Sequence, residues 1–332
     1  MSDTGPGPLE LTEAQMRRFG YSVIDLLVQH FTSLHKKAVG QRASPADIRA
    51  RLNEGLPRGS EPELVLKRVE RDVLPNILHL DHPRFLGFVS SPSNFVSVMA
   101  DTLASGFNVF AGTWLEASGP AQVELVVLDW LKSLLGLSAT AQGVLVSGGS
   151  HANLTALAVM RQVQLEDDAS RAVVYASDQT HSSVARALRI LGFAPKNYRR
   201  LRSTEGKLDP KDIEAAVLSD RAVGLTPACV IANAGTTNTG AVDPLNDLTS
   251  FCESNSIWLH VDGAYGAAAA LSQRGQALLR GLERADSVSL DPHKWLFQPY
   301  EIGCVFLRKG EHLESTFRIV PEYRTPRLTA AK

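Results

Sequence analysis

Short apolar runs that alternate with helix-like segments, beginning near residue 140, constrain the fold of this chain more than any other feature. Runs of strand length occur at residues 143–146, 172–175, 228–231, 257–261, 288–290 and 303–307. Segments of helical character follow several of them, at residues 149–161, 181–191 and 245–254. Strands separated by helices predict an α/β fold with a mostly parallel sheet that is covered on both faces. Ligands of such sheets bind where the loops after the strands converge.

The first part of the chain has a different character. Residues 1–10 are rich in Gly and Pro, and helices are predicted at residues 11–37, 45–52 and 61–74, with Thr12 as the cap of the first. Two further helices are predicted after His82, at residues 95–103 and 121–135. Strand signals are missing from the opening block that precedes His82. We therefore expect an N-terminal helical arm at residues 1–80, a large domain at residues 81–323 and a short tail at residues 324–332.

Composition excludes several classes of protein. The 332 residues carry a formal net charge of −1, so no overall field attracts nucleic acid or an anionic membrane. Cys229, Cys252 and Cys304 are widely spaced, which favours a reducing cytoplasm over a disulfide framework or a zinc site. No signal-peptide pattern and no apolar run of bilayer length is present. We expect a cytoplasmic protein without nucleic-acid or membrane partners.

Lys294 is the most conspicuous charged residue, because it follows the apolar run at 288–290 within Asp291-Pro292-His293-Lys294-Trp295. Among apolar and aromatic groups an ammonium loses hydration, which favours the neutral amine. A neutral amine can attack an aldehyde to form an imine. The simpler interpretation is a lysine that reaches water from the end of a strand.

Other polar residues follow the remaining strands. Asp262 ends the run at 257–261, where an anion needs a partner, and the small residue Ala264 beside it leaves room for a flat ring. His181 follows the run at 172–175 and could cap a helix or stack on a planar ligand. Thr237 follows the run at 228–231 and could form a turn or bind a ligand.

A glycine-rich turn, Ser147-Gly148-Gly149-Ser150, joins the first apolar run to a helix. Gly149 and Ser150 are candidate phosphate donors, because the start of a helix offers free N–H groups. A Walker lysine and a GxGxxG pattern are both missing, so neither a nucleoside triphosphate nor NAD is indicated. An amine, an anion, a planar stacker and a phosphate cradle at one sheet edge meet the needs of pyridoxal phosphate.

These motifs resemble those of the group II pyridoxal-phosphate-dependent amino-acid decarboxylases, and especially the aromatic-L-amino-acid decarboxylase branch. The resemblance includes residues 177–183, 235–237 and 260–265 and runs from about Leu11 to about Tyr323. It implies an aspartate-aminotransferase-like fold (fold type I), with a seven-stranded type of sheet, and a homodimer with sites at the subunit interface.

The resemblance also implies a role for each matching residue. Lys294 corresponds to the imine lysine, Asp262 to the partner of the pyridinium nitrogen, and His181 to the histidine that stacks on the ring. The expected cofactor-binding set is Gly149, Ser150, His181, Thr237, Asp262, Ala264, Asp291, His293 and Lys294. The aromatic branch often has asparagine at the position of Asp291, so we expect this aspartate to turn toward a donor. Ser91, Phe88 and Trp114 correspond to the substrate pocket.

The expected activity is decarboxylation of an L-amino acid, with an aromatic substrate favoured and a glutamate-type or other acidic substrate as the alternative. The family has a further C-terminal domain and a mobile loop whose tyrosine protonates the substrate, and this chain stops before both. The third possibility is therefore an inactive, truncated pyridoxal-phosphate-binding remnant that acts as a dimerisation partner.

Overall fold

The computed structural model of the chain describes residues 10–56, 59–89 and 92–318. The chain divides into two compact units, Met1–Val96 and Ser97–Lys332, which are considered separately. The predicted boundaries of the arm and the large domain stay predictions, and the predicted tail at residues 324–332 lies outside the described residues. Among the described residues, none of the helices has the length and apolar character needed to cross a bilayer.

The first unit is built from helices. It contains α1 (Glu13–Ser33), α2 (Pro45–Leu52) and α3 (Pro62–Arg68), which continues as a π-helical turn, η2 (Val69–Val73). Thr12 caps α1 as predicted, since its side chain accepts from the Gln15 N–H while the Gln15 side chain accepts from the Thr12 N–H. None of the residues within α1, α2 or α3 is fully buried, so these helices leave apolar side chains at the surface.

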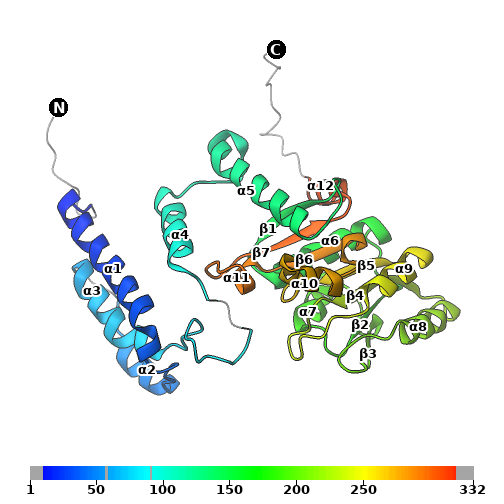
Figure 1. Cartoon of the computed structure of the whole chain (residues 1–332), viewed down its shortest axis with the longest axis horizontal. Coiled ribbons are helices and arrows are strands. Elements are labelled where there is room, and N and C mark those ends of the chain that lie inside the picture. Colours follow the sequence, from blue (N-terminus) through cyan, green and yellow to red (C-terminus); the bar gives the residue numbers. More distant parts are fainter. Residues whose placement is uncertain (1–9, 57–58, 90–91, 319–332) are drawn as a thin grey trace, which may run out of the picture. The chain divides into compact units, whose positions relative to one another are not determined.

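The second unit contains the sheet. Its strands are β1 (Gln142–Val146), β2 (Ala172–Ser177), β3 (Tyr198–Leu201), β4 (Thr226–Asn233), β5 (Trp258–Asp262), β6 (Ser287–Leu290) and β7 (Gly303–Leu307). They form a seven-stranded sheet in the order β1-β7-β6-β5-β4-β2-β3 (Figure 1). The strand β7 runs antiparallel to β1 and β6, and the other neighbouring strands of this sheet pair in parallel. The prediction of a mostly parallel α/β sheet is confirmed.

Helices of the second unit cover both faces of the sheet, with α5 (Trp114–Leu134), α8 (Pro210–Ala222) and α9 (Leu245–Asn255) on one face and α6 (Gly149–Leu165) and α7 (Ser182–Ile190) on the other. The other helices are α4 (Phe95–Phe107), which begins at the boundary between the two units, α10 (Gln273–Leu278), α11 (Pro292–Trp295) and α12 (Gly310–Phe317). Alternate residues of one strand enter different cores: Val173 and Tyr175 pack with α5, α8 and α9, whereas Val174 packs with α6 and α7. A strand buried on both faces is an unbroken apolar run, which explains why the sequence revealed it.

Elements that were not predicted have identifiable causes. The edge strand β3 contains Arg199 and Arg200, so it does not form an apolar run; Arg199 instead binds Asp220 on α8. The helix α8 has a recognisable start, because Asp209 caps it and Pro210 occupies its first position. The helix α5 begins at Trp114 rather than near residue 121, with non-helical backbone at Ala117.

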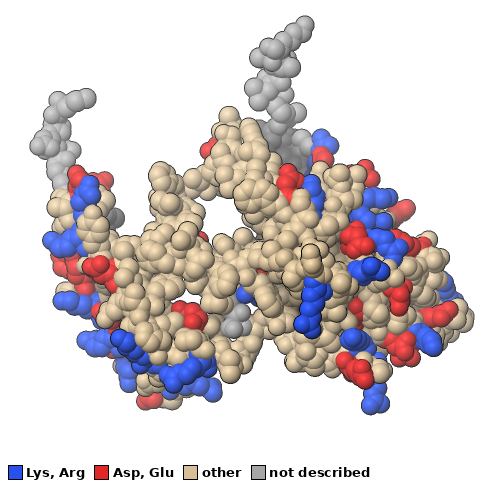
Figure 2. Space-filling view, viewed as in Figure 1, with Lys and Arg blue, Asp and Glu red and all other residues tan. Residues whose placement is uncertain are grey.

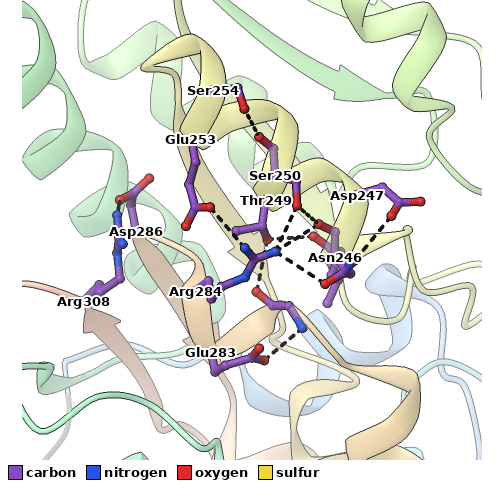
Figure 3. A network of polar contacts seen from close by, with 12 residues as sticks. Asn246, Asp247, Thr249, Ser250, Glu253, Ser254, Glu283, Arg284, Asp286 and Arg308 are labelled. Atoms are coloured by element: carbon purple, nitrogen blue, oxygen red, sulfur yellow. Dashed lines mark hydrogen bonds and ion pairs between the residues drawn. The ribbon is translucent and has the colours of Figure 1, made fainter.

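Arg284 ties α9 to the segment before β6 (Figure 3). Its guanidinium donates to Ser250 Oγ at 3.1 Å and to the Asn246 carbonyl at 3.2 Å, and it pairs with Glu253 at 3.1 Å. The neighbouring Asp286 accepts from the Leu259 N–H of β5 and pairs with Arg308 just after β7. These contacts fix the start of β6, whose other end carries Asp291 and Lys294.

Candidate active site

Lys294 lies on the single turn of helix α11, directly after β6. Its Nζ lies 2.9 Å from Asp291 Oδ2, and its side chain is only 23% exposed. One helical turn places residues three apart side by side, so the Lys294 amine faces the Asp291 carboxylate. This environment is more polar than the apolar and aromatic one that the sequence suggested.

Asp262 is the last residue of β5 and is buried. Three donors converge on its carboxylate: Asn153 Nδ2 at 2.9 Å, Ser289 Oγ at 3.2 Å and the Ala264 N–H at 3.2 Å. They compensate for the hydration that this carboxylate loses on burial. The carboxylate of Asp262 is thus held in a fixed position at the edge of the sheet.

Asn153 connects Asp262 to the histidine beneath it. The Asn153 amide nitrogen donates to Asp262, so its oxygen accepts from His260 Nε2 at 3.0 Å. Burial lowers the pKa of His260 to about 4, and this ring is neutral at pH 7. Its proton therefore lies on Nε2, while Nδ1 accepts from Ser287 Oγ at 2.9 Å.

His181 caps α7 with its ring. Its Nδ1 accepts from the Ser183 N–H at 3.3 Å and lies 2.9 Å from Ser183 Oγ, which in turn accepts from Asn153. Because Nδ1 accepts this hydrogen bond, the ring N–H lies on Nε2, the nitrogen left for a ligand. Hydrogen bonds through Ser183 and Asn153 connect His181 to Asp262.

The start of α6 forms the phosphate side of the site. Gly148 has a φ of +88°, a left-handed conformation that favours glycine. A Cβ on Gly149 would lie 2.8 Å from Asp291 Oδ2 and 2.9 Å from the Ala264 methyl, so a larger residue does not fit there. Free N–H groups at this helix start are suited to an anion.

Asp291 is the unusual member of this side. It turns toward a donor as predicted, since Lys294 and His293 lie 2.9 Å and 3.6 Å from Oδ2. Its other oxygen, Oδ1, is buried without a hydrogen-bond partner among the described residues. Burial raises the pKa of Asp291 more than the nearby Lys294 lowers it. His293 accepts from the Ile302 N–H through Nδ1, and burial lowers its pKa.

These side chains surround one cavity of about 240 Å³. All residues of the predicted cofactor-binding set line it: Gly149, Ser150, His181, Thr237, Asp262, Ala264, Asp291, His293 and Lys294. The strands place them there, because β1, β2, β4, β5 and β6 all end at this edge of the sheet. Their roles in binding stay a prediction.

The predicted substrate residues are not part of the described lining of this cavity. Trp114 starts α5 with 57% of its surface exposed. Phe88 belongs to the first unit, is 85% exposed, and lies beside Phe85 with ring centroids 6.1 Å apart. Ser91 lies outside the described residues.

Sequence reasoning missed several residues of the site. Asn153 lies four positions after Gly149 on α6, on the same helix face, and that spacing was an available signal. Asn233, Tyr300 and Glu301 also line the cavity, together with Gly235, Thr236 and Tyr265, which lie within the motifs that the sequence had already singled out. Tyr300 and Glu301 lie in the irregular segment before β7, where no periodicity indicates direction.

A seven-stranded sheet of this order, with a lysine, a buried carboxylate and a glycine-rich helix start at one edge, defines the large domain of a fold type I pyridoxal-phosphate protein. Residues 45–328 match the pyridoxal-dependent decarboxylase conserved domain. The chain belongs to the pyridoxal-dependent decarboxylase family, and pyridoxal phosphate is the cofactor of that family.

Individual relatives agree with this assignment. The chain is 49% identical over 317 residues to an aromatic-L-amino-acid decarboxylase of Bacillus atrophaeus, covering 95% of this chain and 66% of that protein. It is 32% identical to a phenylacetaldehyde synthase of Petunia hybrida, covering 94% of this chain and 64% of that protein. A crystal structure of Oryza sativa TDC with PLP and tryptamine superposes with a TM-score of 0.90 at 30% identity, covering 96% and 68% of the two chains. The chain thus spans about two thirds of the length of the relatives it matches.

The residues present fit the cofactor. Asp262 offers a fixed anion for a ring nitrogen, Lys294 an amine for an aldehyde, and the α6 start a narrow anion cradle that a Cβ at Gly149 would fill. The unpaired Asp291 Oδ1 is a hydrogen-bonding atom without a protein partner in the described chain. Both ends of a phosphorylated pyridine ring therefore have chemically suitable neighbours.

Proposed function

We propose that this chain forms the cofactor-binding part of an enzyme that decarboxylates an aromatic L-amino acid to the corresponding amine and CO₂. The observation that carries the proposal is the convergence of Lys294, Asp262 and His181 on one cavity, at the ends of three different strands. The identity with an aromatic-L-amino-acid decarboxylase over 95% of the chain supports the substrate class.

Each of these residues would perform one task. Pyridoxal phosphate, when bound, accepts the electrons of the bond that breaks at the substrate Cα. Asp262 would hold a proton on the pyridine nitrogen, because its three donors favour the anion. Lys294 would bind the aldehyde carbon, and His181 would lie against the ring with its Nε2 proton toward the substrate carboxylate.

The phosphate would bind at the start of α6. Gly149 and Ser150 would donate from their backbone, Thr237 would contribute its hydroxyl, and His293 would donate through Nε2, since its Nδ1 already accepts a hydrogen bond. Asp291 would contribute through Oδ1 only in its protonated form, as a hydrogen-bond donor, because a carboxylate repels a phosphate dianion. Fixing the phosphate orients the ring between Asp262 and His181.

The test uses the purified chain with added pyridoxal phosphate. The expected result is visible absorption of the lysine-bound cofactor, followed by CO₂ and amine release from aromatic L-amino acids. Release from L-glutamate alone would replace the aromatic proposal with the acidic alternative. Absorption without CO₂ from any amino acid would support the inactive remnant, and a lack of absorption would overturn both.

We further propose a homodimer. Large apolar side chains of the second unit remain exposed on or near α4 and α5: Leu103, Phe107, Phe110, Trp114, Leu115, Val123 and Trp130. Figure 2 shows few charged residues over α4 and α5. Apolar area of this extent is typical of protein interfaces. Sedimentation equilibrium should give twice the chain mass, and a monomer at micromolar concentration would contradict the homodimer.

A cytoplasmic location is the last part of the proposal. Cys229, Cys252 and Cys304 are all free and buried, and burial raises the pKa of each thiol. Thiols of this kind remain protonated and suit a reducing compartment. Cell fractionation that recovers the protein outside the cytoplasm would contradict this location.

A further inference from the structure

Three side chains of metal-ligand type converge in the first unit, whose described residues include none that line the cofactor cavity. His30 lies near the end of α1, and His79 and Asp81 lie in the segment after η2. One ligand atom from each lies within 4.8 Å of the others, and all three residues are partly buried. His30 Nε2 is 2.7 Å from Asp81 Oδ2, and the two imidazole centroids are 5.4 Å apart.

The backbone holds this cluster in place. The His79 N–H donates to the Val39 carbonyl at 2.8 Å, and Gly40 forms an isolated antiparallel bridge with Leu78. A Cβ on Gly40 would meet the Ile77 carbonyl oxygen at 2.8 Å, so the two segments touch through backbone. The positions of His79 and Asp81 relative to the end of α1 are therefore set before any ligand binds.

His79 has an unused ligand atom. Its Nδ1 is buried and has no hydrogen-bond partner in the described part of the chain. A buried polar atom without a partner costs free energy, and folded proteins rarely retain one.

A cavity of about 480 Å³ opens onto the same two histidines. Its walls are mostly apolar, with Leu26, Leu74 and Ile77 among them, and Glu70 is the only acidic residue of its described lining. An ion bound by His30 and His79 would face this space. A water molecule or a small ligand could then complete the coordination.

We propose that His30, His79 and Asp81 form a binding site for one divalent ion of the zinc class. Two imidazoles and one carboxylate suit Zn²⁺, Co²⁺ or Ni²⁺ better than Mg²⁺ or Ca²⁺, which prefer oxygen ligands. Three protein ligands and an open fourth position form a common zinc arrangement. The ion would cross-link α1 to the segment that contains His79.

Binding requires a small rearrangement. Ligand atoms about 2.0–2.1 Å from a tetrahedral ion lie roughly 3.3 Å apart, so the His30–Asp81 pair must open by side-chain rotation. His30 Nε2 then coordinates through its lone pair, and the proton it shared with Asp81 goes to solvent or is replaced by one on Nδ1. The carboxylate changes from hydrogen-bond acceptor to ligand.

The test is a calorimetric titration of the full chain, without chelators or pyridoxal phosphate. Zn²⁺ should bind with one-to-one stoichiometry, Mg²⁺ should give no comparable heat, and Co²⁺ should give the visible absorption of a tetrahedral site. His79→Ala and Asp81→Asn should each weaken Zn²⁺ binding at least about tenfold. The control is His35→Ala, because His35 is an exposed imidazole just after α1 that is not part of the cluster.

The Asp81→Asn variant is expected to fold, since its amide oxygen can still accept a hydrogen bond from His30. If thermal unfolding shows that His79→Ala does not fold, the asparagine variant decides. Zn²⁺ binding that neither variant weakens, or binding that His35→Ala weakens equally, would overturn the site. The cofactor proposal is unaffected by either outcome, because none of these residues lines the cofactor cavity.

Discussion

The two ends of the cofactor cavity each contain a buried carboxylate, and the two carboxylates differ in their hydrogen bonding. Asp262 accepts from three donors, and Asn153 fixes those contacts from α6. Asp291 contacts Lys294 and His293 through Oδ2 and leaves Oδ1 without a partner in the described chain. The hydrogen bonds of Asp262 are formed before a ligand binds, whereas Asp291 still has an oxygen atom that can form a hydrogen bond with a ligand. Four substitutions test this difference.

The largest effect is expected for Lys294→Ala, which removes the amine on which the cofactor depends. The visible absorption of the bound cofactor should disappear, and decarboxylation should fall at least roughly 10³-fold. Absorption spectra and CO₂ release measure both. Lys309→Ala, at an exposed lysine just after β7, is the control. If the Lys294 variant keeps the absorption band, the lysine assignment is wrong.

Asp262→Asn should have the next largest effect. The amide has nearly the same shape but no charge to hold a proton on the ring nitrogen, so kcat should fall about 10²–10³-fold. KM should change little, because the substrate does not contact this side chain. Steady-state kinetics measures both quantities, and Asp247→Asn on the exposed face of α9 is the control. An unchanged kcat would mean that the charge of Asp262 is not needed.

Asn153→Leu tests how much the hydrogen bonds of Asn153 around Asp262 stabilise the fold. The variant leaves Asp262 and His260 each without one partner, which should destabilise the fold by about 2–4 kcal/mol. Urea unfolding of the chain without cofactor measures this loss. Asn153→Gln can restore an amide to the cavity, and partial rescue of the bound-cofactor spectrum would separate positioning from simple destabilisation. Equal stability of Asn153→Leu and the parent chain would contradict the proposed network.

Asp291→Asn should have the smallest effect of the four substitutions, and the size of its effect on stability and on cofactor affinity should depend on pH. Burial raises the pKa of Asp291 above that of the unfolded chain, so the folded protein binds this proton more tightly. Stability of the parent should fall as pH rises from the unfolded pKa through the folded pKa, and the asparagine variant should lack this decline. Cofactor affinity of the variant should exceed that of the parent by up to about tenfold at the higher pH, since a carboxylate repels a phosphate dianion.

Two measurements check this last prediction: unfolding against pH, and cofactor affinity against pH. The ratio of the two affinities should rise with pH and become constant once Asp291 is ionised. A constant ratio over the whole range would show that Asp291 holds the same protonation state with and without the phosphate.

Much of the sheet could be predicted, and the reason is burial. Strands such as β2 and β4 are apolar on both faces, so their sequence alone reveals them. The strand β3 could not be found in this way, because it contains the charged residue Arg199. This side chain is partly buried only because it pairs with Asp220, which is distant in sequence. The start of α5 was misplaced because a kink at Ala117 has no local signature.

The candidate site could also be predicted only in part. Each cofactor residue follows a strand, so its place at one edge of the sheet followed from the order of strands and helices. The contacts within the site did not, since Asn153 on α6 is far in sequence from His260 and Asp262 of β5 and meets them only where the helix packs on the sheet.

The sequence by itself determined the layered α/β fold and the set of residues at the strand ends, because both follow from local apolar periodicity and from chain order. Only the tertiary structure decided which carboxylate is satisfied and which is not. Hydrogen bonding depends on distances and angles between side chains from different strands, and no local pattern encodes these. The same reason applies to His30, His79 and Asp81, which backbone contacts bring together from two separate segments.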